Sequence, residues 1–483
     1  MLSIDEILSE VLETIIPTPH EIAYINNVTK NLQEKIEKKS KELKIEYTVI
    51  EPQGSTGIKQ TQLRNDFDID LFIGLDYQYY RPKYKGLSKN KLKKVSKKDF
   101  LELCTKWIIP SLRAEEFNNP RLLYAEHPYV TVDYSLGDIK TKIDVVLYFD
   151  LELDFIKTRG PITAVDRSPW HGRFIRDNLS NNQKNDVRLL KQFFKANYSY
   201  GDKSSVGKIG FIGYSAELLI YYYETLQNVF DNFHTLKSKP LDFYKRELSD
   251  LEKIPHFQND YLIIVDPIDK NRNVGSAISE QAYKYCNHRI TQFLKNPEKT
   301  FFEIEPVKMA EPKLLNTSLL SKLFVVELKN SDDNIHYTIN RDKLHSLGES
   351  IKSNGEKELN HTERFTNIVF EVYFEDEINE YNICFYCETP ELSHSYSRRG
   401  PPIKEHSHVK KFIKKNPTYF EKDGFLWVEV QRKFTDFLSF LKNFIKIKLP
   451  ANFEVINISN VLTTKTSSGK KAITILKDMV LPF

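Results

Sequence analysis

The chain has 483 residues, more than one hydrophobic core accommodates, so several domains are expected. Its formal net charge of +4 is small, so a nucleic-acid-binding surface would have to come from local clusters of basic residues. No apolar run is long enough to span a membrane, and four cysteines are too few for a disulfide framework. We expect a cytoplasmic protein without membrane contact.

The first part of the chain predicts a domain of mixed helices and strands. Helical periodicity covers residues 4–44, where Pro17 and Pro19 separate a short helix from a longer one. Four strand-like runs follow, at residues 45–50, 67–73, 125–134 and 143–148. Between Gly74 and Lys98 the chain is polar and rich in lysine, which predicts either a solvated loop or an arm that contacts phosphate.

The rest of the chain predicts a helical segment and then a second unit. Amphipathic helices are expected at residues 187–197 and 215–229, followed by a short apolar strand at 261–265 and a helix after Gly275. The second unit is expected to contain strands at 323–328, 367–374 and 382–387, next to a polar stretch, 330–361, that contains a helix. The end of the chain predicts a strand at 426–433 and then a helix at 434–448. The expected fold class is α+β and multidomain.

Two cysteines could at first be taken for a metal-binding pair. Cys384 and Cys387 lie in a run that predicts a strand, and an odd separation places two side chains on opposite faces of a strand. The sequence has no second pair. We therefore predict structural cysteines and no zinc site.

Three acidic residues carry the first chemical signal. Asp68 and Asp70 are two apart in a predicted strand, so their side chains share a face, twelve residues after the small turn Gly54-Ser55. Asp144 is the lone charge in an apolar strand, residues 143–147, and is the candidate for a third carboxylate on an adjacent strand. Carboxylates beside a small turn suit Mg²⁺ that carries a triphosphate, which indicates the nucleotidyltransferase superfamily.

The chemistry expected at these residues uses two Mg²⁺ ions. One ion would bind Asp68, Asp70 and Asp144 and lower the pKa of an RNA 3′-hydroxyl, while the other would bridge Asp68 and Asp70 to the triphosphate. Together they would stabilise in-line attack at the α-phosphorus and the departure of pyrophosphate. Ser55 can donate a hydrogen bond to a phosphate oxygen, and Gly54 permits close approach of the backbone.

Several motifs, taken together and in this order, resemble the archaeal-type, class I CCA-adding enzymes. From about residue 4 to residue 274 they keep the order and nearly the spacing of that family. Weaker similarity continues through residues 397–401, 409–412 and 432–434. The motifs are YAEHPYV at 124–130, AVDRSPWH at 164–171, VRLLK at 187–191, YG at 200–201, GYS at 213–215, VDPID at 265–269 and RNV at 272–274.

The resemblance implies a tRNA nucleotidyltransferase that adds C, C and A to tRNA 3′ ends from CTP and ATP without a nucleic-acid template. Asp68, Asp70 and Asp144 would be its metal carboxylates. The implied nucleotide contacts are Ser55, Ser168, His171, Lys191 and Tyr200 on the triphosphate or ribose, and Arg272 near the incoming base. The alternative for Arg272 is a structural salt bridge to Asp266 or Asp269.

The resemblance also implies four parts. They are a catalytic head of the polymerase-β type at residues 1–157, a nucleotide-binding helical neck at 158–255, an α/β body at 256–302 and 426–483, and a tRNA-binding tail at 303–425. Formation of a homodimer stays open. Poly(A) or oligoadenylate polymerases share the acidic residues and remain an alternative, as does a catalytically silent RNA-binding protein.

The chain departs from the family pattern in the turn after Ser55. This turn is one residue longer than expected, and its cation is Lys59, whose contact with phosphate stays open. Ser168 stands where the family usually has threonine. The basic stretch 81–98 and the stretch 330–361 lie outside the resemblance.

A cluster of basic residues in the expected tail could bind RNA phosphates. A tRNA acceptor stem is a short duplex that proteins recognise through its shape and phosphates. Arg398 and Arg399 and then Lys410 and Lys411 are the candidates, within a segment that extends from residue 393 to residue 415. The alternative is a solvated helix face.

Overall fold

The computed structural model describes residues 3–124, 127–136, 139–311, 317–332, 335–358 and 363–483. The chain divides into two units. Unit 1 comprises Met1–Asn197, Phe211–Ile278 and Asn287–Ile304. Unit 2 comprises Tyr198–Gly210, Ser279–Cys286 and Glu305–Phe483. The predicted boundaries of head, neck, body and tail are a finer division and stay a prediction.

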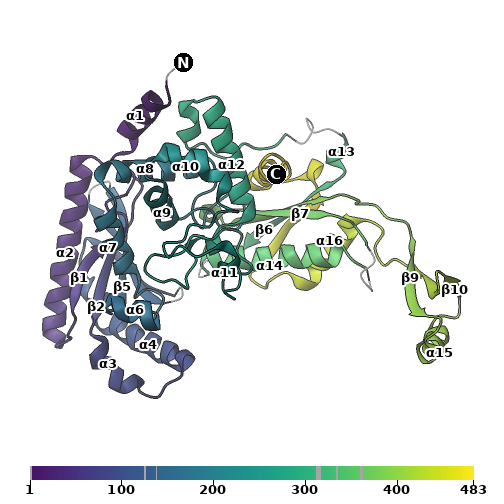
Figure 1. Cartoon of the computed structure of the whole chain (residues 1–483), viewed down its shortest axis with the longest axis horizontal. Coiled ribbons are helices and arrows are strands. Elements are labelled where there is room, and N and C mark those ends of the chain that lie inside the picture. Colours follow the sequence, from purple (N-terminus) through teal and green to yellow (C-terminus); the bar gives the residue numbers. More distant parts are fainter. Residues whose placement is uncertain (1–2, 125–126, 137–138, 312–316, 333–334, 359–362) are drawn as a thin grey trace. The chain divides into compact units, whose positions relative to one another are not determined.

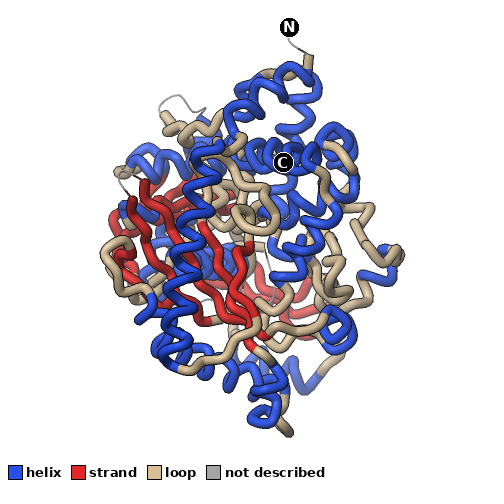
Figure 2. Tube along the Cα trace, turned by 90° about the vertical axis from the view of Figure 1, so that its left-hand side faces the viewer, coloured by secondary structure: helices blue, strands red, loops and turns tan. Residues whose placement is uncertain are grey.

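Two helices open unit 1, as the sequence predicts. Helix α1 (Ile4–Ile15) and helix α2 (Pro19–Leu43) each begin with a capping box, formed by Ser3 with Glu6 and by Thr18 with Glu21. Pro19 occupies the first turn of α2, where its missing N–H costs nothing. Buried residues of α2 pack in the same core as the central strands, and Figure 2 shows this long helix lying across the sheet.

The central sheet of unit 1 has five strands in the order β1-β2-β5-β4-β3. Strands β2 and β5 run parallel, and the other neighbours are antiparallel. Residues 125 and 126, where the third predicted strand was expected to begin, lie outside the described residues. The strands are β1 (Val49–Gln53), β2 (Ile69–Leu75), β3 (Phe117–Tyr124), β4 (Pro128–Leu136) and β5 (Ile139–Phe149).

The lysine-rich stretch after Gly74 is helical, so the prediction of a solvated loop is wrong. It forms α3 (Tyr77–Tyr84) and α4 (Lys89–Leu103), which continues into a π-helical turn and α5 (Ile109–Ser111). The reason is that Tyr84, Phe100 and Trp107 are buried in the core of the sheet domain, while most of the lysines stay exposed. A single apolar stripe that packs against the core is enough to stabilise a helix whose other faces are polar.

Helices fill the rest of unit 1. The predicted strand at 261–265 forms only isolated bridges, between Leu241 and Ile264 and between Val265 and Asn273. The helix expected after Gly275 is α12 (Glu280–Lys295), whose first turns belong to unit 2. The other helices are α6 (Leu153–Arg159), α7 (Ser168–Asn178), α8 (Asn181–Ala196), α9 (Gly213–Tyr223), α10 (Leu226–Asn232) and α11 (Leu248–Leu251).

Unit 2 contains a four-stranded antiparallel sheet in the order β12-β6-β8-β7. Helices α14 and α16 pack on one face and α17 on the other. Cys387 belongs to the first core and Cys384 to the second, so the two thiols point to opposite faces of β8, as predicted. The elements are α13 (Thr317–Leu320), β6 (Leu323–Asn330), α14 (Tyr337–Gly355), β7 (Ile368–Glu375), β8 (Glu380–Cys387), α16 (Phe437–Lys448), β12 (Phe453–Asn460) and α17 (Ser467–Thr474).

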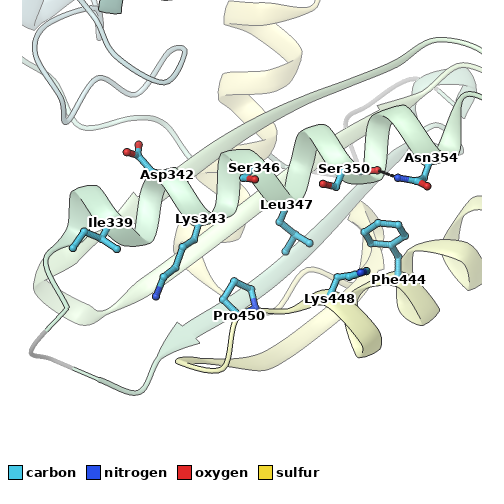
Figure 3. A pocket seen from close by; sticks show the side chains of 10 residues that line it. All are labelled: Ile339, Asp342, Lys343, Ser346, Leu347, Ser350, Asn354, Phe444, Lys448 and Pro450. Carbon is cyan, nitrogen blue, oxygen red and sulfur yellow. Dashed lines mark hydrogen bonds between the residues drawn. The ribbon is translucent and has the colours of Figure 1, made fainter. Parts of the chain in front are cut away.

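A smaller sheet in unit 2 has the strand order β10-β11-β9. It is formed by β9 (Ser395–Pro402), β10 (Tyr419–Lys422) and β11 (Phe425–Gln431), and α15 (His406–Lys415) packs against β9 (Figure 1). A cavity of about 760 Å³ lies between α14 and α16 (Figure 3). Its apolar lining includes Leu347 and Phe444, and Lys343 and Lys448 are its basic residues.

Candidate active site

Two of the three predicted carboxylates face each other in the central sheet. Asp70 on β2 is the direct neighbour of Asp144 on the parallel strand β5. Asp70 also pairs in register with Gln53, the last residue of β1, so the Gly54-Ser55 turn begins beside it. Asp68 precedes β2, which starts two residues later than predicted, and the Asp68 carbonyl accepts a hydrogen bond from the Thr56 hydroxyl at 2.9 Å.

The electrostatics of these carboxylates indicate crowded negative charge. Burial, together with the charges of Asp144 and Asp68, raises the pKa of Asp70 to about 7. Burial also raises the pKa of Asp68, although Lys142 opposes the shift. Carboxylates that repel one another in this way are stabilised by a cation placed among them.

Lys142 is a neighbour that the sequence did not predict. Its Nζ lies 3.1 Å from Oδ2 of Asp144, whereas Oδ1 of Asp144 is buried and has no hydrogen-bond partner in the described part of the chain. With the side chains in this arrangement, no three His, Cys, Asp or Glu residues among those described are placed to share a metal ion. The oxygen donors and the unsatisfied Asp144 oxygen nevertheless fit a hard divalent cation.

Gly54 is required by the close approach of the turn to Asp70. Its φ of 67° lies in the left-handed region, and a Cβ built at this position would collide with the Asp70 carboxylate. Ser55 is half-buried in the same turn. The small turn and the Asp70 carboxylate are therefore fitted to each other.

A buried ionic cluster lies in the same unit. Lys59 Nζ is 2.7 Å from Oε2 of Glu217, and Lys191 Nζ is 3.5 Å from Oε1 of the same residue. The Thr61 hydroxyl donates to Glu217 at 2.7 Å, and Lys191 donates to Thr61. Burial lowers the pKa of Lys191 to about 8, although the Glu217 carboxylate opposes the shift. Two predicted nucleotide contacts, Lys59 and Lys191, thus meet on one carboxylate.

Asp266 forms a second cluster with two predicted residues. It accepts from His171 Nε2 at 2.8 Å, from the Arg272 guanidinium at 2.8 Å and from the Tyr214 hydroxyl at 3.1 Å. The ring of Tyr214 stacks on the ring of His171. Nζ of Lys59 also lies over the Tyr214 ring, 4.8 Å from its centroid. Tyr214 therefore connects the two clusters.

The charges in the second cluster have defined directions. Although burial raises it, the interactions with His171 and Arg272 keep the pKa of Asp266 well below its usual range, so its carboxylate is ionised. Burial lowers the pKa of His171, against the opposing effect of Asp266. Since an ionised carboxylate only accepts, Nε2 of His171 carries the proton that the two groups share.

The remaining predicted nucleotide contacts are placed differently. Ser168 is the first residue of α7, three positions before His171, and is half-buried. Tyr200 is half-buried and belongs to unit 2, whereas the other predicted nucleotide contacts belong to unit 1. The structure thus brings Lys59 and Lys191 together and joins His171 to Arg272 through Asp266.

Glu217 and Tyr214 were missed as positioning residues by the sequence interpretation, which considered Asp266 only as a structural ion-pair partner of Arg272. Each of the three lies within or beside a motif that was noticed, GYS at 213–215 or VDPID at 265–269. The available signal was a lone acidic residue in an apolar helix, since Glu217 is followed by Leu218, Leu219 and Ile220.

The predicted RNA-binding residues lie in the small sheet of unit 2. Arg398 on β9 is half-buried and donates to the Asn416 side chain at 3.2 Å, and Arg399 lies over the ring of Phe425. Lys410 and Lys411 on α15 are exposed. Arg398 therefore supports the packing of this region, while the two lysines are open to a ligand.

The structure also bears on membrane contact: among the described residues, none of the helices combines the length and the apolar composition needed to span a bilayer.

The fold and the matched domains define the class of protein. The fold is a mixed α+β chain of two units, and the matched domains are those of tRNA nucleotidyltransferases. Residues 185–303 match the family model described as tRNA nucleotidyltransferase, second domain, and residues 337–451 match that described as CCA-adding enzyme, C-terminal domain.

Curated relatives extend the match over nearly the whole chain. A CCA-adding enzyme of Saccharolobus islandicus (strain M.14.25 / Kamchatka #1) is 30% identical over 453 residues, which are 93% of this chain and 95% of the relative. One of Methanococcus maripaludis is 29% identical and covers 92% of each chain. A solved structure of a cytoplasmic RNA terminal U-transferase has 15% identity, covers 63% of this chain and 99% of its own, and has a TM-score of 0.43. The chain belongs to the family of CCA-adding enzymes, which are tRNA nucleotidyltransferases.

Proposed function

We propose that the protein completes or repairs the CCA end of tRNA by transferring C, C and A from CTP and ATP to the RNA 3′ end, with release of pyrophosphate. Its relatives are CCA-adding enzymes along nearly their whole length. The observation that supports the chemistry is the pairing of Asp70 with Asp144 in register beside the Gly54-Ser55 turn. A cytoplasmic location and a homodimer stay predictions.

The proposal assigns Asp68, Asp70 and Asp144 to the binding of Mg²⁺, with two ions expected. When bound, such ions supply activation of the 3′-hydroxyl and neutralise charge on the triphosphate. Lys142 holds one oxygen of Asp144 through its ammonium group, at 3.1 Å. The same lysine can move toward solvent, because its side chain is 42% exposed, and thereby free that oxygen.

Lys59 and Lys191 are proposed to bind triphosphate oxygens. Glu217 neutralises part of their charge and holds both ammonium groups in place before a nucleotide arrives. A triphosphate brings enough negative charge to compete with Glu217 for Lys59, whereas Lys191 is also fixed by Thr61. Gly54, Ser55 and Ser168 are proposed as further nucleotide contacts, and the role implied for Tyr200 stays a prediction.

His171 is proposed to contact phosphate through its other ring nitrogen. Because Nε2 shares its proton with Asp266, Nδ1 can donate to an anion only when the ring is protonated. An approaching phosphate favours that protonation, since opposite charges raise the pKa of an imidazole. Asp266 then orients the ring and stabilises the imidazolium.

Arg272 is proposed to read the incoming base. Its guanidinium donates to Asp266 through one nitrogen, and its side chain is 29% exposed, so the other donors can face a ligand. The alternative is a purely structural ion pair. If Arg272 reads the base, Arg272→Ala will reduce the preference for CTP over UTP in steady-state kinetics with all four nucleotides. An unchanged preference would leave only the structural role.

The proposed function is tested with tRNA that lacks its CCA end, incubated with CTP and ATP separately and together. We expect two C residues from CTP alone and a complete CCA end from both nucleotides, as resolved by mass spectrometry. Long adenylate tails from ATP alone would favour the polymerase alternative. Absence of any incorporation would favour the silent RNA-binding alternative.

The matched variant for this test is Asp70→Asn. We expect it to lose incorporation of both nucleotides by about 10³-fold or more, because a metal carboxylate is lost. Asp133→Asn, in the same sheet but paired with Arg121, is the control. Retained activity in Asp70→Asn would reject the assignment of the carboxylates.

A further inference from the structure

A basic cavity in unit 1 is separate from the residues assigned so far. It has a volume of about 900 Å³ and is lined by the end of α6, the following loop and two segments near residues 254–256 and 269–271. One residue of the lysine-rich helix α4, Lys93, also lines it. This cavity therefore joins the lysine-rich stretch to the part of the chain that carries the AVDRSPWH motif.

The lining of the cavity is strongly positive. Asp269 is the one acidic residue among the lining residues, and its carboxylate already pairs with Arg167 at 2.8 Å. The basic side chains are exposed apart from Arg167, which is half-buried. These basic residues are Lys93, Lys157, Arg159, Arg167, His256 and Lys270.

Arg167 is the fixed element of this cavity. Its side chain is only 17% exposed, and its Nε is buried without a hydrogen-bond partner in the described residues. The pairing with Asp269 holds the guanidinium in place, while the lysines that line the cavity are exposed. A half-buried arginine among exposed cations suits an anion with several oxygens better than a single small ion.

The cavity adjoins the candidate nucleotide site through one turn. Asp266, at the start of the turn, binds His171 and Arg272, whereas Asp269, three residues later, binds Arg167. Arg167 in turn directly precedes Ser168 and helix α7. A ligand in the basic cavity would therefore lie next to the residues that are proposed to hold the nucleotide.

We propose that this cavity binds backbone phosphates of the RNA strand whose 3′ end is extended. Several cations spread around a wide cavity match a phosphate chain, because backbone contacts need charge and not a fitted apolar pocket. The inference rests on the proposed function, which supplies the RNA. It gives the lysine-rich helix α4 a role through Lys93, which lies outside the motifs shared with the CCA-adding enzymes.

The test measures binding of tRNA that lacks its CCA end, without nucleotide, across a series of salt concentrations. The double variant Lys93→Ala/Lys157→Ala removes two exposed cations from the cavity. We expect roughly tenfold weaker binding at low salt and a log–log salt slope that is shallower by about 0.7 to 0.9 for each lost contact. Lys30→Ala/Lys38→Ala, on the exposed side of α2, is the charge-matched control and should leave both values unchanged.

Affinity and slope that match those of the control would overturn the proposal. Pyrophosphate is the second probe, because it shares the phosphate chemistry. If the double variant loses binding of pyrophosphate but keeps the parent slope for tRNA, the cavity holds free phosphate and the assignment to RNA is wrong.

Nucleotide incorporation separates this inference from the proposed function. At saturating tRNA the double variant should incorporate CTP at the parent rate, since neither lysine lies in the nucleotide site, while its KM for tRNA rises. A parent protein that incorporates no nucleotide would reject the proposed function. The binding measurements would still decide whether the cavity contacts RNA.

Discussion

Glu217 shows how one buried side chain organises the candidate nucleotide site. Its side chain is 1% exposed and it contacts Lys59, Lys191 and Thr61. Removing one partner of a buried ion pair leaves the remaining charge buried and uncompensated. The free-energy cost of this is larger than the stabilisation that the intact pair provides. The residue is therefore a positioning group for the two lysines.

We predict that Glu217→Gln lowers the free energy of unfolding by about 3 kcal/mol, because Lys59 and Lys191 lose their shared carboxylate. A triphosphate can replace the missing negative charge, so saturating CTP should raise the melting temperature of the variant more than that of the parent. Thermal unfolding with and without CTP measures both effects. Glu252→Gln, on the exposed surface of unit 1, is the control. Equal stabilisation of variant and parent by CTP would contradict a role of these lysines in nucleotide binding.

Glu371 gives unit 2 a defined dependence on pH. Its carboxylate accepts from the backbone N–H groups of Gly207 at 2.8 Å and Val372 at 3.0 Å. Burial raises its pKa from 4.5 to about 7. The folded state thus retains a proton that the unfolded chain releases above pH 4.5, and the stability this proton provides is lost as the pH rises toward 7.

We predict that Glu371→Gln removes this contribution to the pH dependence. The free energy of unfolding of the variant minus that of the parent should increase with pH between about 5 and 7, by up to about 1.4 kcal/mol per pH unit. Urea unfolding at several pH values in this range provides the measurement. Asp70 and Asp166 also have raised pKa values, but they are present in both proteins. Their contributions therefore cancel in the difference between the two free energies of unfolding, which reports Glu371 alone. A difference that stays constant with pH would exclude the assignment.

At the scale of elements, strand β9 and helix α15 divide the basic cluster of unit 2 into two kinds of residue. Arg398 is tied to Asn416 at the end of α15, so its substitution would disturb packing as well as charge. Lys410 and Lys411 stand exposed on α15. The helix residues therefore offer the cleaner test of RNA binding.

We predict that Lys410→Ala/Lys411→Ala weakens binding of tRNA and makes its salt dependence shallower by about 0.7 to 0.9 in log–log slope per lost phosphate contact. The melting temperature should not change, because neither side chain is buried. Lys442→Ala/Lys446→Ala on the exposed face of α16 is the matched control. A change of melting temperature with unchanged tRNA affinity would assign α15 to structure alone.

Elements with a clear hydrophobic period were predictable from the sequence. The helices α1 and α2 and the strands β6, β7 and β8 lie within a few residues of their predicted positions. The stretch after Gly74 was not predictable as helix, because its lysines conceal the sparse apolar residues that reach the core. The apolar run at 261–265 was taken for a strand, but only isolated bridges pair with it. The apolar composition of this run therefore indicates that its side chains are buried, and not that its backbone pairs in a β-sheet.

The candidate site was predictable where its residues are close in sequence. Alternation around Asp68 and Asp70 identified the first carboxylates, and a lone charge identified Asp144. Glu217 is 158 positions from Lys59, and Asp266 is 95 positions from His171, so these partners become neighbours only through the fold. A single sequence does not encode such pairings in any local pattern.

At the scale of the whole molecule, the two units are not successive stretches of chain. The segment Tyr198–Gly210 belongs to unit 2, although it follows α8 and precedes α9, both of unit 1. Within unit 2, Asp202 in this segment accepts from Arg341 and from the Tyr337 hydroxyl of α14, and Gly207 donates to Glu371 of β7. Residues 305–483 alone thus lack partners for buried polar groups.

We predict that a fragment of residues 305–483 unfolds at a lower temperature and less cooperatively than the full chain, because Glu371 and Arg341 lose these partners. Circular dichroism during heating measures this. Fragment Glu371→Gln should be less affected than the parent fragment at neutral pH, since it has no buried carboxylate that has lost one of its two backbone donors. A parent fragment as stable as the full chain would show that the segment 198–210 contributes nothing to unit 2.

The passage of the chain between the two units also bears on how such a protein can change over evolutionary time. The backbone crosses from one unit to the other five times, after residues 197, 210, 278, 286 and 304. A single recombination event in the gene cannot exchange one unit and leave the other intact, because each would keep a piece of the wrong parent. Homologous chimaeras are therefore expected to survive only when both units come from closely related sequences, and the two halves are constrained to be inherited together.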